Sequence, residues 1–388
     1  MRSTLRHAST VIVILVQLVV GAAAASASAA AEPIRIGAVF SESGGFASVG
    51  SPGLNGMRLA TAQINAHGGV LARDLKLIAA DSRSRSGAVA RAVRTLIKDR
   101  GVVALGGLND STLALAAGPV AQRAGIPFVS SGATLPTLPK RIGNAFFMAA
   151  YGDNAQAQAL ADLARSNLHA NSAFLLVDRR ADFTRALARF FRNDFIEPGG
   201  TIAGELSYAT GERDFGAAMA AIRAQSPPPD VLFFSGLPSE AGPLVRQARA
   251  AGLTQPILSG DGFDTPLIGR RAGALADDVF YSTHVALDSR APRIRRFVAA
   301  YRKRYGHRPE NAFAALGYDT ARLLADAIRR ARSDQPNAIR QALAATRHFP
   351  MVTGTLSYAP ARRTPVKPVT IIRVQNGRPR FYRTVTPR

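Results

Sequence analysis

The chain has 388 residues, a formal net charge of +23 and no cysteine. This length suits two domains of ordinary size. The lack of cysteine excludes disulfides and a lipid-modified cysteine at a mature amino terminus. Residues 290–388 carry 22 Lys and Arg against four Asp and Glu, so the basic surplus lies in the last quarter. No zinc-ligand spacing or recognition-helix signature accompanies it, and we expect no nucleic-acid function.

Residues 1–31 have the pattern of a secretory signal. Two arginines precede an apolar segment at 11–20, and small residues follow it. Cleavage after Ala29 or Ala31 fits, because each ends an Ala-x-Ala pattern. No later apolar stretch approaches the length of a membrane span. We therefore expect a mature protein free in an exported compartment, most simply a bacterial periplasm, and not a lipoprotein.

Short apolar runs alternate with amphipathic segments along the first part of the mature chain. The runs predict strands at 34–40, 75–81, 102–105, 128–130 and 146–148. Periodic apolar residues predict helices at 54–67 and 88–99. A third helix, capped at 109–111, runs through 115 and 120 to 124, and a fourth, capped by Asp153, runs to about residue 167. Strands that alternate with helices of this length indicate a parallel α/β architecture.

The alternation continues in the second part, where strands are predicted at 173–177, 202–208, 231–236, 256–259 and 279–282. The helices between them are predicted at 183–195, 215–224 and 240–251. Three further amphipathic helices are predicted at 293–305, 312–332 and 337–345, the first with the arginine cluster 293–296 on a solvated face. The chain ends in strands at 354–358, 369–374 and 381–385, with Asn376-Gly377 as a hairpin turn.

Two segments look like copies of one helix–turn–strand unit, residues 121–132 and 248–260. Each has a helix end, a glycine, a short strand and a polar loop. Ligands of parallel sheets bind outside the carboxyl ends of the strands, where such loops converge. Two similar lobes that face each other would enclose a cleft, although any protein built of βαβ units repeats itself in this way.

The order and spacing of several short motifs give a resemblance to a known family. They are Ser43-Gly44-Gly45, residues 64–69, Asp81 at a strand end, residues 246–253, and the flanking segments 235–236 and 259–262. Together they resemble the type I periplasmic binding proteins, which deliver leucine, isoleucine, valine and related solutes to ABC transporters. The similarity covers residues 32–388.

The resemblance implies an α/β fold with two Rossmann-like lobes, whose central, mostly parallel sheets are joined by a three-crossover hinge. It implies an N-terminal lobe of residues 32–150 plus 286–350 and a C-terminal lobe of residues 151–285 plus 351–388. Hinge closure would bury a small solute, which the protein would pass to a membrane permease. No catalysis and no cofactor are implied, and we expect a monomer.

In the first lobe, the resemblance implies a ligand carboxylate held after the third and fourth strands. The matching positions are Asp110 or Ser111, and the loop Gly132-Ala133-Thr134. Hydroxyls and backbone amides suit a desolvated anion. An Asp110 that pointed inward would instead repel a carboxylate. A hydrophobic amino acid, an amide or urea-like solute and an aromatic acid therefore all remain open as ligands.

In the second lobe, the resemblance implies that Asp261 takes the ligand's ammonium group. Phe313, on a helix that returns to the first lobe, would lie over the ligand side chain. Phe183 falls where the family commonly has a tyrosine. Val49 and Leu237 also replace tyrosines of the amino-acid binders, which makes this pocket less polar.

Several of these residues have a structural alternative. Asp110 and Ser111 can serve as helix caps, Thr134 as a turn hydroxyl, and Phe313 as ordinary core. Asp261, between two glycines at a strand end, has no obvious structural task. The six histidines are scattered, so no metal site is expected.

Two other functions compete with transport. An α/β hydrolase is disfavoured, because the chain has no Gly-x-Ser-x-Gly elbow, no phosphate loop and no cysteine nucleophile. A ligand sensor that signals to a receptor stays open.

Overall fold

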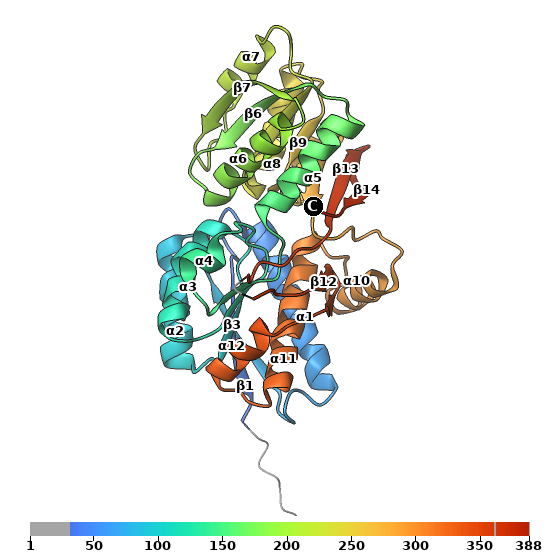
Figure 1. Ribbon diagram of the computed structural model, residues 1–388. Coiled ribbons are helices and arrows are strands. Elements are labelled where there is room, and N and C mark those ends of the chain that lie inside the picture. The colour runs from blue at the N-terminus through green and yellow to red at the C-terminus, as the bar shows by residue number, and fades with distance from the viewer. Residues whose placement is uncertain (1–31, 361, 388) are drawn as a thin grey trace, which may run out of the picture. The chain divides into compact units, whose positions relative to one another are not determined.

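Figure 1 shows the computed structural model, which describes residues 32–360 and 362–387. The predicted signal segment and both predicted cleavage points lie outside the described residues. Residues 33–388 pack as one unit around two large β-sheets. Below, the first lobe means the five-stranded sheet with the helices on its faces, and the second lobe means the seven-stranded sheet with its helices.

The first lobe has a fully parallel sheet in the order β2-β1-β3-β4-β5. Its strands are β1 (Ile34–Phe40), β2 (Leu75–Asp81), β3 (Ala104–Gly107), β4 (Phe128–Ser130) and β5 (Phe146–Met148). The helices are α1 (Ala47–Ala66), α2 (Ser86–Arg100), α3 (Ser111–Arg123), α4 (Leu138–Ile142), α11 (Ala312–Ala331) and α12 (Pro336–Ala344). The parallel α/β prediction is confirmed here.

Both faces of this sheet are buried, because side chains along a strand point alternately to its two sides. Ile36 and Phe40 of β1 pack in the core with α1 and α11, whereas Val39 packs with α2 and α3. Figure 1 shows α2, α3 and α4 on one side of β3, and α1 and α11 on the other. This packing explains why the strands read as continuous apolar runs in the sequence.

The second lobe has a seven-stranded sheet in the order β14-β13-β10-β9-β8-β6-β7. Its strands are β6 (Ser172–Asp178), β7 (Thr201–Tyr208), β8 (Val231–Ser235), β9 (Ile257–Ser259), β10 (Val279–Thr283), β13 (Val369–Gln375) and β14 (Arg378–Val385). The five strands from β7 to β10 are parallel, and β13 and β14 are antiparallel to their neighbours. Asn376 and Gly377 both have positive φ, which confirms the predicted hairpin turn.

Helices also cover both faces of the second sheet. They are α5 (Asp153–Asp162), α6 (Asp182–Ile196), α7 (Gly216–Arg223), α8 (Pro238–Ala250) and α9 (Leu267–Ala272). Leu175 and Phe233 pack toward α5 and α6, and Phe174 and Phe234 pack toward α7 and α8.

The predicted repeat is present as α3-turn-β4 in the first lobe and α8-turn-β9 in the second. Each helix is followed by a glycine with positive φ, 68° at Gly125 and 81° at Gly252. A left-handed glycine ends a helix without steric cost, which explains why both copies have glycine at this point. The two units place the loops after β4 and β9 at equivalent edges of the two sheets.

The final crossing between the lobes follows a short hairpin of β11 (Phe349–Met351) and β12 (Gly354–Leu356). Met351, Leu356 and Tyr358 pack in the same core as β1 and α11. Residues after Tyr358 then lead to β13 in the second sheet. The exact division of the chain into domains stays a prediction.

Helix α10 (Pro292–Tyr305) carries much of the basic surplus. Ile294, Phe297, Val298 and Tyr301 pack inward, while the arginines of the 293–296 cluster are exposed. The predicted solvated face is therefore confirmed. Within the described residues, no helix has the length and apolar character needed to cross a membrane.

Candidate functional site

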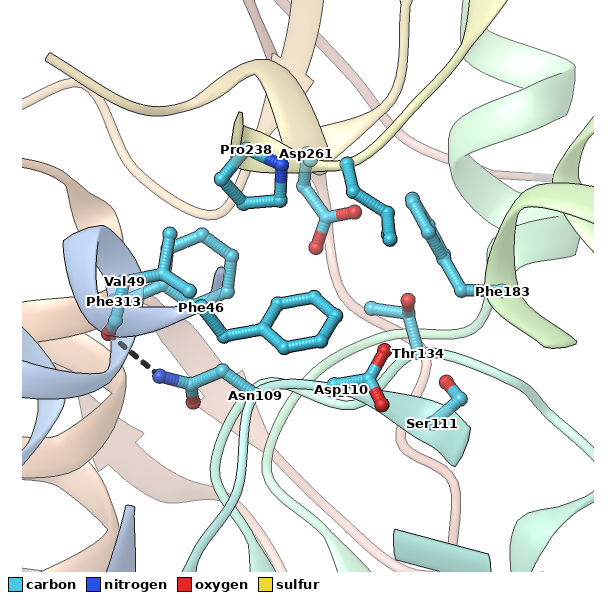
Figure 2. Close-up of a pocket in the computed structure, with 12 residues that line it drawn as sticks. Phe46, Val49, Asn109, Asp110, Ser111, Thr134, Phe183, Pro238, Asp261 and Phe313 are labelled. Carbon is cyan, nitrogen blue, oxygen red and sulfur yellow. Dashed lines mark hydrogen bonds between the residues drawn. The ribbon is translucent and has the colours of Figure 1, made fainter. Parts of the chain in front are cut away.

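A pocket with about 290 Å³ of empty space lies among loops and helix ends from both lobes. Figure 2 shows its lining side chains pointing toward one another across the space. Its lining combines aromatic and aliphatic groups with a few polar ones: Phe46, Val49, Asn109, Asp110, Ser111, Thr134, Phe183, Leu237, Pro238, Asp261, Gly262 and Phe313. The structure thus brings together eight predicted ligand-binding residues; Gly132 and Ala133 are not in this lining.

Asp110 and Ser111 both line the pocket, and their hydrogen bonds differ. The amide of Leu113 donates to Asp110 Oδ1 at 2.8 Å, so Asp110 is the N-cap of α3. Ser111 Oγ accepts from the amide of Leu135 at 3.1 Å, which ties the loop after β4 to α3. The structural alternative of helix capping therefore holds for Asp110. Asp110 thus caps α3 and lines the pocket at the same time.

The loop after β4 contributes Thr134 to the lining. Gly132 and Ala133, the other two residues of this loop that were predicted to bind the ligand, lie beneath the lining. Ala133 is buried in the core of the first lobe. A Cβ on Gly132 would lie only 2.7 Å from both Asn109 Oδ1 and the ring of Phe313. Gly132 is therefore needed for the close approach of the loop to Phe313 and Asn109.

The rest of the first-lobe wall is largely apolar. Val49 and Phe313 form one small buried cluster, with Phe46 packed against it. Asn109 Nδ2 donates to the carbonyl oxygen of Val49 at 2.8 Å, as the dashed line in Figure 2 shows. This bond leaves Asn109 Oδ1 buried without a hydrogen-bond partner in the described structure. This oxygen lies against Gly132, beneath the lining of the pocket.

The second-lobe wall is formed by Phe183 in the first turn of α6, by Leu237 and Pro238 where α8 begins, and by the loop after β9. Phe183 and Leu237 stand where the resemblance places tyrosines, and neither side chain has a polar group. Asp261 and Gly262 supply the polar part of this wall.

Asp261 is held in place by two buried side chains. Gln156 Nε2 donates to Asp261 Oδ1 at 3.2 Å, and the amide of Asp261 donates back to Gln156 Oε1 at 3.1 Å. His284 Nε2 lies 3.0 Å from Asp261 Oδ2. Asp261 is only 3% exposed, so its carboxylate is fixed in orientation before any ligand arrives.

Burial sets the charge of the groups behind Asp261. The pKa of His284 is lowered because desolvation disfavours its charged form. The pKa of Asp153, which accepts from Gln156 Nε2 at 2.9 Å, is raised well above its usual range by the same desolvation. Tyr151 packs over the His284 ring with centroids 4.3 Å apart. Neutral His284 therefore orients Asp261 without cancelling its charge.

The sequence reasoning missed the supporting residues Gln156 and His284. His284 directly follows β10. A polar residue directly after a predicted strand could have marked it as a candidate site residue. Gln156 lies inside α5 and gave no such signal. Asp153, predicted as a helix cap, is instead the first residue of α5 and makes no cap bond.

Two hydrogen bonds join the lobes beside the pocket, one at Ser48 and one at Asp264. Ser48 Oγ pairs with Thr265 Oγ1 of the second lobe at 3.1 Å, and the carbonyl of Ser48 accepts from Asn311 Nδ2 of its own lobe at 2.8 Å. Asp264 Oδ2 accepts from Thr283 Oγ1 at 2.6 Å and from the amide of Ala312 at 3.0 Å. Asp264 thus links the end of β10 to the start of α11.

Asp264 should make stability depend on pH. Burial raises its pKa to about 6 from the ordinary value of 3.8, so the folded state binds this proton more tightly than the unfolded chain. Its contribution to the free energy of unfolding therefore falls as pH rises from about 4 to about 6. Asp264→Asn, which keeps an acceptor oxygen, should flatten the change in Tm over this window. Identical pH profiles for the parent and the variant in thermal melts would contradict this assignment.

Comparison with known proteins places the chain in a family. The model of the Periplasmic binding protein family matches residues 33–379. The chain belongs to the periplasmic binding protein family. Proteins of this family bind solutes and are not enzymes. Among the described residues of this periplasmic binding protein, no group of three or more acidic or histidine side chains is placed to hold a metal ion.

Individual relatives have related descriptions. The amino acid binding protein of Pseudomonas aeruginosa is 32% identical over 252 residues, which cover 63% of this chain and 64% of that relative. The Leu/Ile/Val-binding protein homolog 7 of Brucella abortus is 25% identical, covering 81% of this chain and 82% of that protein. The branched-chain amino acid transporter substrate binding protein LivJ of Streptococcus pneumoniae, solved with isoleucine, is 28% identical with a TM-score of 0.86. That similarity covers 92% of this chain and all of LivJ.

Proposed function

We propose that this protein is the substrate-binding component of an ABC transporter, which captures a small, hydrophobic amino-acid-like solute and delivers it to a membrane permease. The observation that carries the proposal is the pocket itself. It receives Asp110, Ser111 and Thr134 from one lobe and Asp261 from the other, around a small apolar space. A site built from two lobes can close on a solute and present both lobes to a permease.

The lining of the pocket indicates the kind of solute. The aromatic rings of Phe46, Phe183 and Phe313 surround an aliphatic side chain well. Asp261 is fixed at one end of this space and suits an amino group. The relatives that are described as binding branched-chain amino acids agree with an aliphatic side chain in this place.

The proposal includes the place where the protein works. We infer that the signal-like segment 1–31 directs export and is removed, so that the mature protein works in the periplasm as a monomer. The cysteine-free sequence leaves no site for a lipid anchor at the mature amino terminus.

A thermal-shift screen tests the proposal. The purified mature protein is melted with aliphatic amino acids, their amides and amines, and aromatic acids, each at millimolar concentration. A ligand present at 100 times its Kd adds about 2.7 kcal/mol to the free energy of unfolding by mass action, so Tm should rise by several degrees. A bulky cationic amino acid such as arginine serves as the control. Failure of every aliphatic compound to raise Tm would overturn the proposed function.

A further inference from the structure

The charged groups that line the pocket all have one sign. Asp110 and Asp261 are carboxylates, and the lining includes no Lys, Arg or His. Opposite walls of a space of about 290 Å³ therefore each carry an acidic group. A zwitterionic amino acid would bring a third carboxylate into this space, where a low local dielectric strengthens repulsion.

The charge on Asp261 is not cancelled from behind. His284 bonds to its Oδ2 but is buried, and the loss of water lowers the pKa of that imidazole. Gln156 is neutral and is shared between Asp261 and Asp153. The second-lobe wall therefore offers negative charge and hydrogen-bond acceptors to a ligand.

The first-lobe wall places the carboxylate of Asp110 beside the two hydroxyls of Ser111 and Thr134. Asn109 Nδ2 is engaged by the carbonyl of Val49 and is not available to an anion. The amides of Leu113 and Leu135 are engaged by Asp110 Oδ1 and Ser111 Oγ. The sequence resemblance matches the anion-binding position to Asp110 or Ser111, and a carboxylate bound there would lie beside the Asp110 carboxylate in either case.

We propose that the solute has an amino group and further N–H donors but no free carboxylate, as in the amide of an aliphatic amino acid. Its ammonium bonds to Asp261, its aliphatic side chain lies among Phe46, Phe183 and Phe313, and its carboxamide nitrogen donates toward Asp110. This inference rests on the proposed function and specifies its ligand class. Asp110 is then a specificity-determining residue that rejects free amino acids.

Isothermal titration calorimetry on the mature protein at about pH 7.5 tests this with L-leucinamide and L-leucine, which differ only at the carboxyl end. Leucinamide should bind at least 10-fold more tightly than leucine. If leucine binds as tightly as leucinamide or more tightly, the inference is overturned while the proposed function stands. If neither these two nor any other aliphatic compound of the screen binds, the proposed function fails, and this inference fails with it.

Variants at Asp110 separate its charge from its capping role. Serine and asparagine both cap helices well, so Asp110→Ser and Asp110→Asn should keep α3 intact. Each should shift the leucine-to-leucinamide affinity ratio at least 10-fold toward leucine. Asp182→Asn is the matched control, because Asp182 is a nearby carboxylate that does not line the pocket. An unchanged ratio in both folded Asp110 variants would overturn the role of Asp110.

Discussion

Asp261→Asn should weaken ligand binding by about 30-fold to 4,000-fold, the range of about 2–5 kcal/mol that follows loss of one partner of a buried charged hydrogen bond. Asp261 is the acidic group of the second-lobe wall, and Gln156 and His284 fix its two oxygens. Asparagine keeps the shape and one acceptor, but it removes the negative charge that an ammonium group requires. Isothermal titration calorimetry with the compound that stabilises the protein most in the screen measures the loss.

The fold should survive this substitution. His284 can adopt the tautomer that accepts a hydrogen bond from the Nδ2 of the introduced asparagine, so both neighbours of the side chain keep a partner. Asp288→Asn is the matched control, because Asp288 lies outside the pocket lining. Binding that stays within about twofold of the parent in Asp261→Asn would remove Asp261 from the ligand site.

Lys367→Met should lower the free energy of unfolding by about 3 kcal/mol or more, because it removes the buried cation that acts on the buried carboxylate of Asp319 through Thr353. Lys367 is 1% exposed. Its Nζ donates to the carbonyl of Ala149 at 3.0 Å and to Thr353 Oγ1 at 2.7 Å. Asp319 accepts the Thr353 amide and hydroxyl on the other side. Lys367 lies just before β13. Its cation thus links this segment to Ala149, which follows β5, and to Thr353 in the β11–β12 hairpin.

Denaturant unfolding of both proteins measures this effect. Burial lowers the pKa of Lys367 to about 8 from 10.5, so the unfolded chain binds this proton more tightly than the folded one between these values. Its contribution to stability therefore rises as pH increases from about 8 to about 10, and Lys367→Met should remove that rise. Arg362→Met, at an exposed position nearby, should change the free energy of unfolding by less than about 0.5 kcal/mol. Equal stabilities of the Lys367 and Arg362 variants would contradict the buried-pair interpretation.

Local patterns were sufficient for most of the secondary structure. The strand Phe128–Ser130 lies where the sequence predicts it, because a strand that is buried on both faces consists of a run of apolar residues. Gly125 and Gly252 also lie where the sequence predicts them, because a turn with positive φ favours glycine. Helix α1 begins at Ala47, before the predicted residue 54, since Pro52 and the glycines around it obscure the helical pattern. Pro52 lies in the second turn and cannot donate to the carbonyl of Ser48, which accepts from Asn311 Nδ2 at 2.8 Å instead.

The candidate site was only partly predictable. Polar residues after strand ends mark Asp110, Thr134 and Asp261, since the carboxyl edge of a parallel sheet is where loops gather. The sequence left open whether Asp110 or Ser111 faces the pocket, and the structure places both there with different hydrogen bonds. Whether these residues bind the ligand stays a prediction until binding is measured.

The sequence by itself determined the fold class, the repeated helix–turn–strand units and the family, because these depend on periodicity and on motifs within short stretches of chain. Only the tertiary structure decided that Gln156 and His284 hold Asp261, and that Asn109 Nδ2 is already engaged by Val49. Gln156 and Asp261 lie 105 positions apart in the chain. Hydrogen-bond partners at such separations depend on how the sheets and helices pack, and no local pattern records that packing.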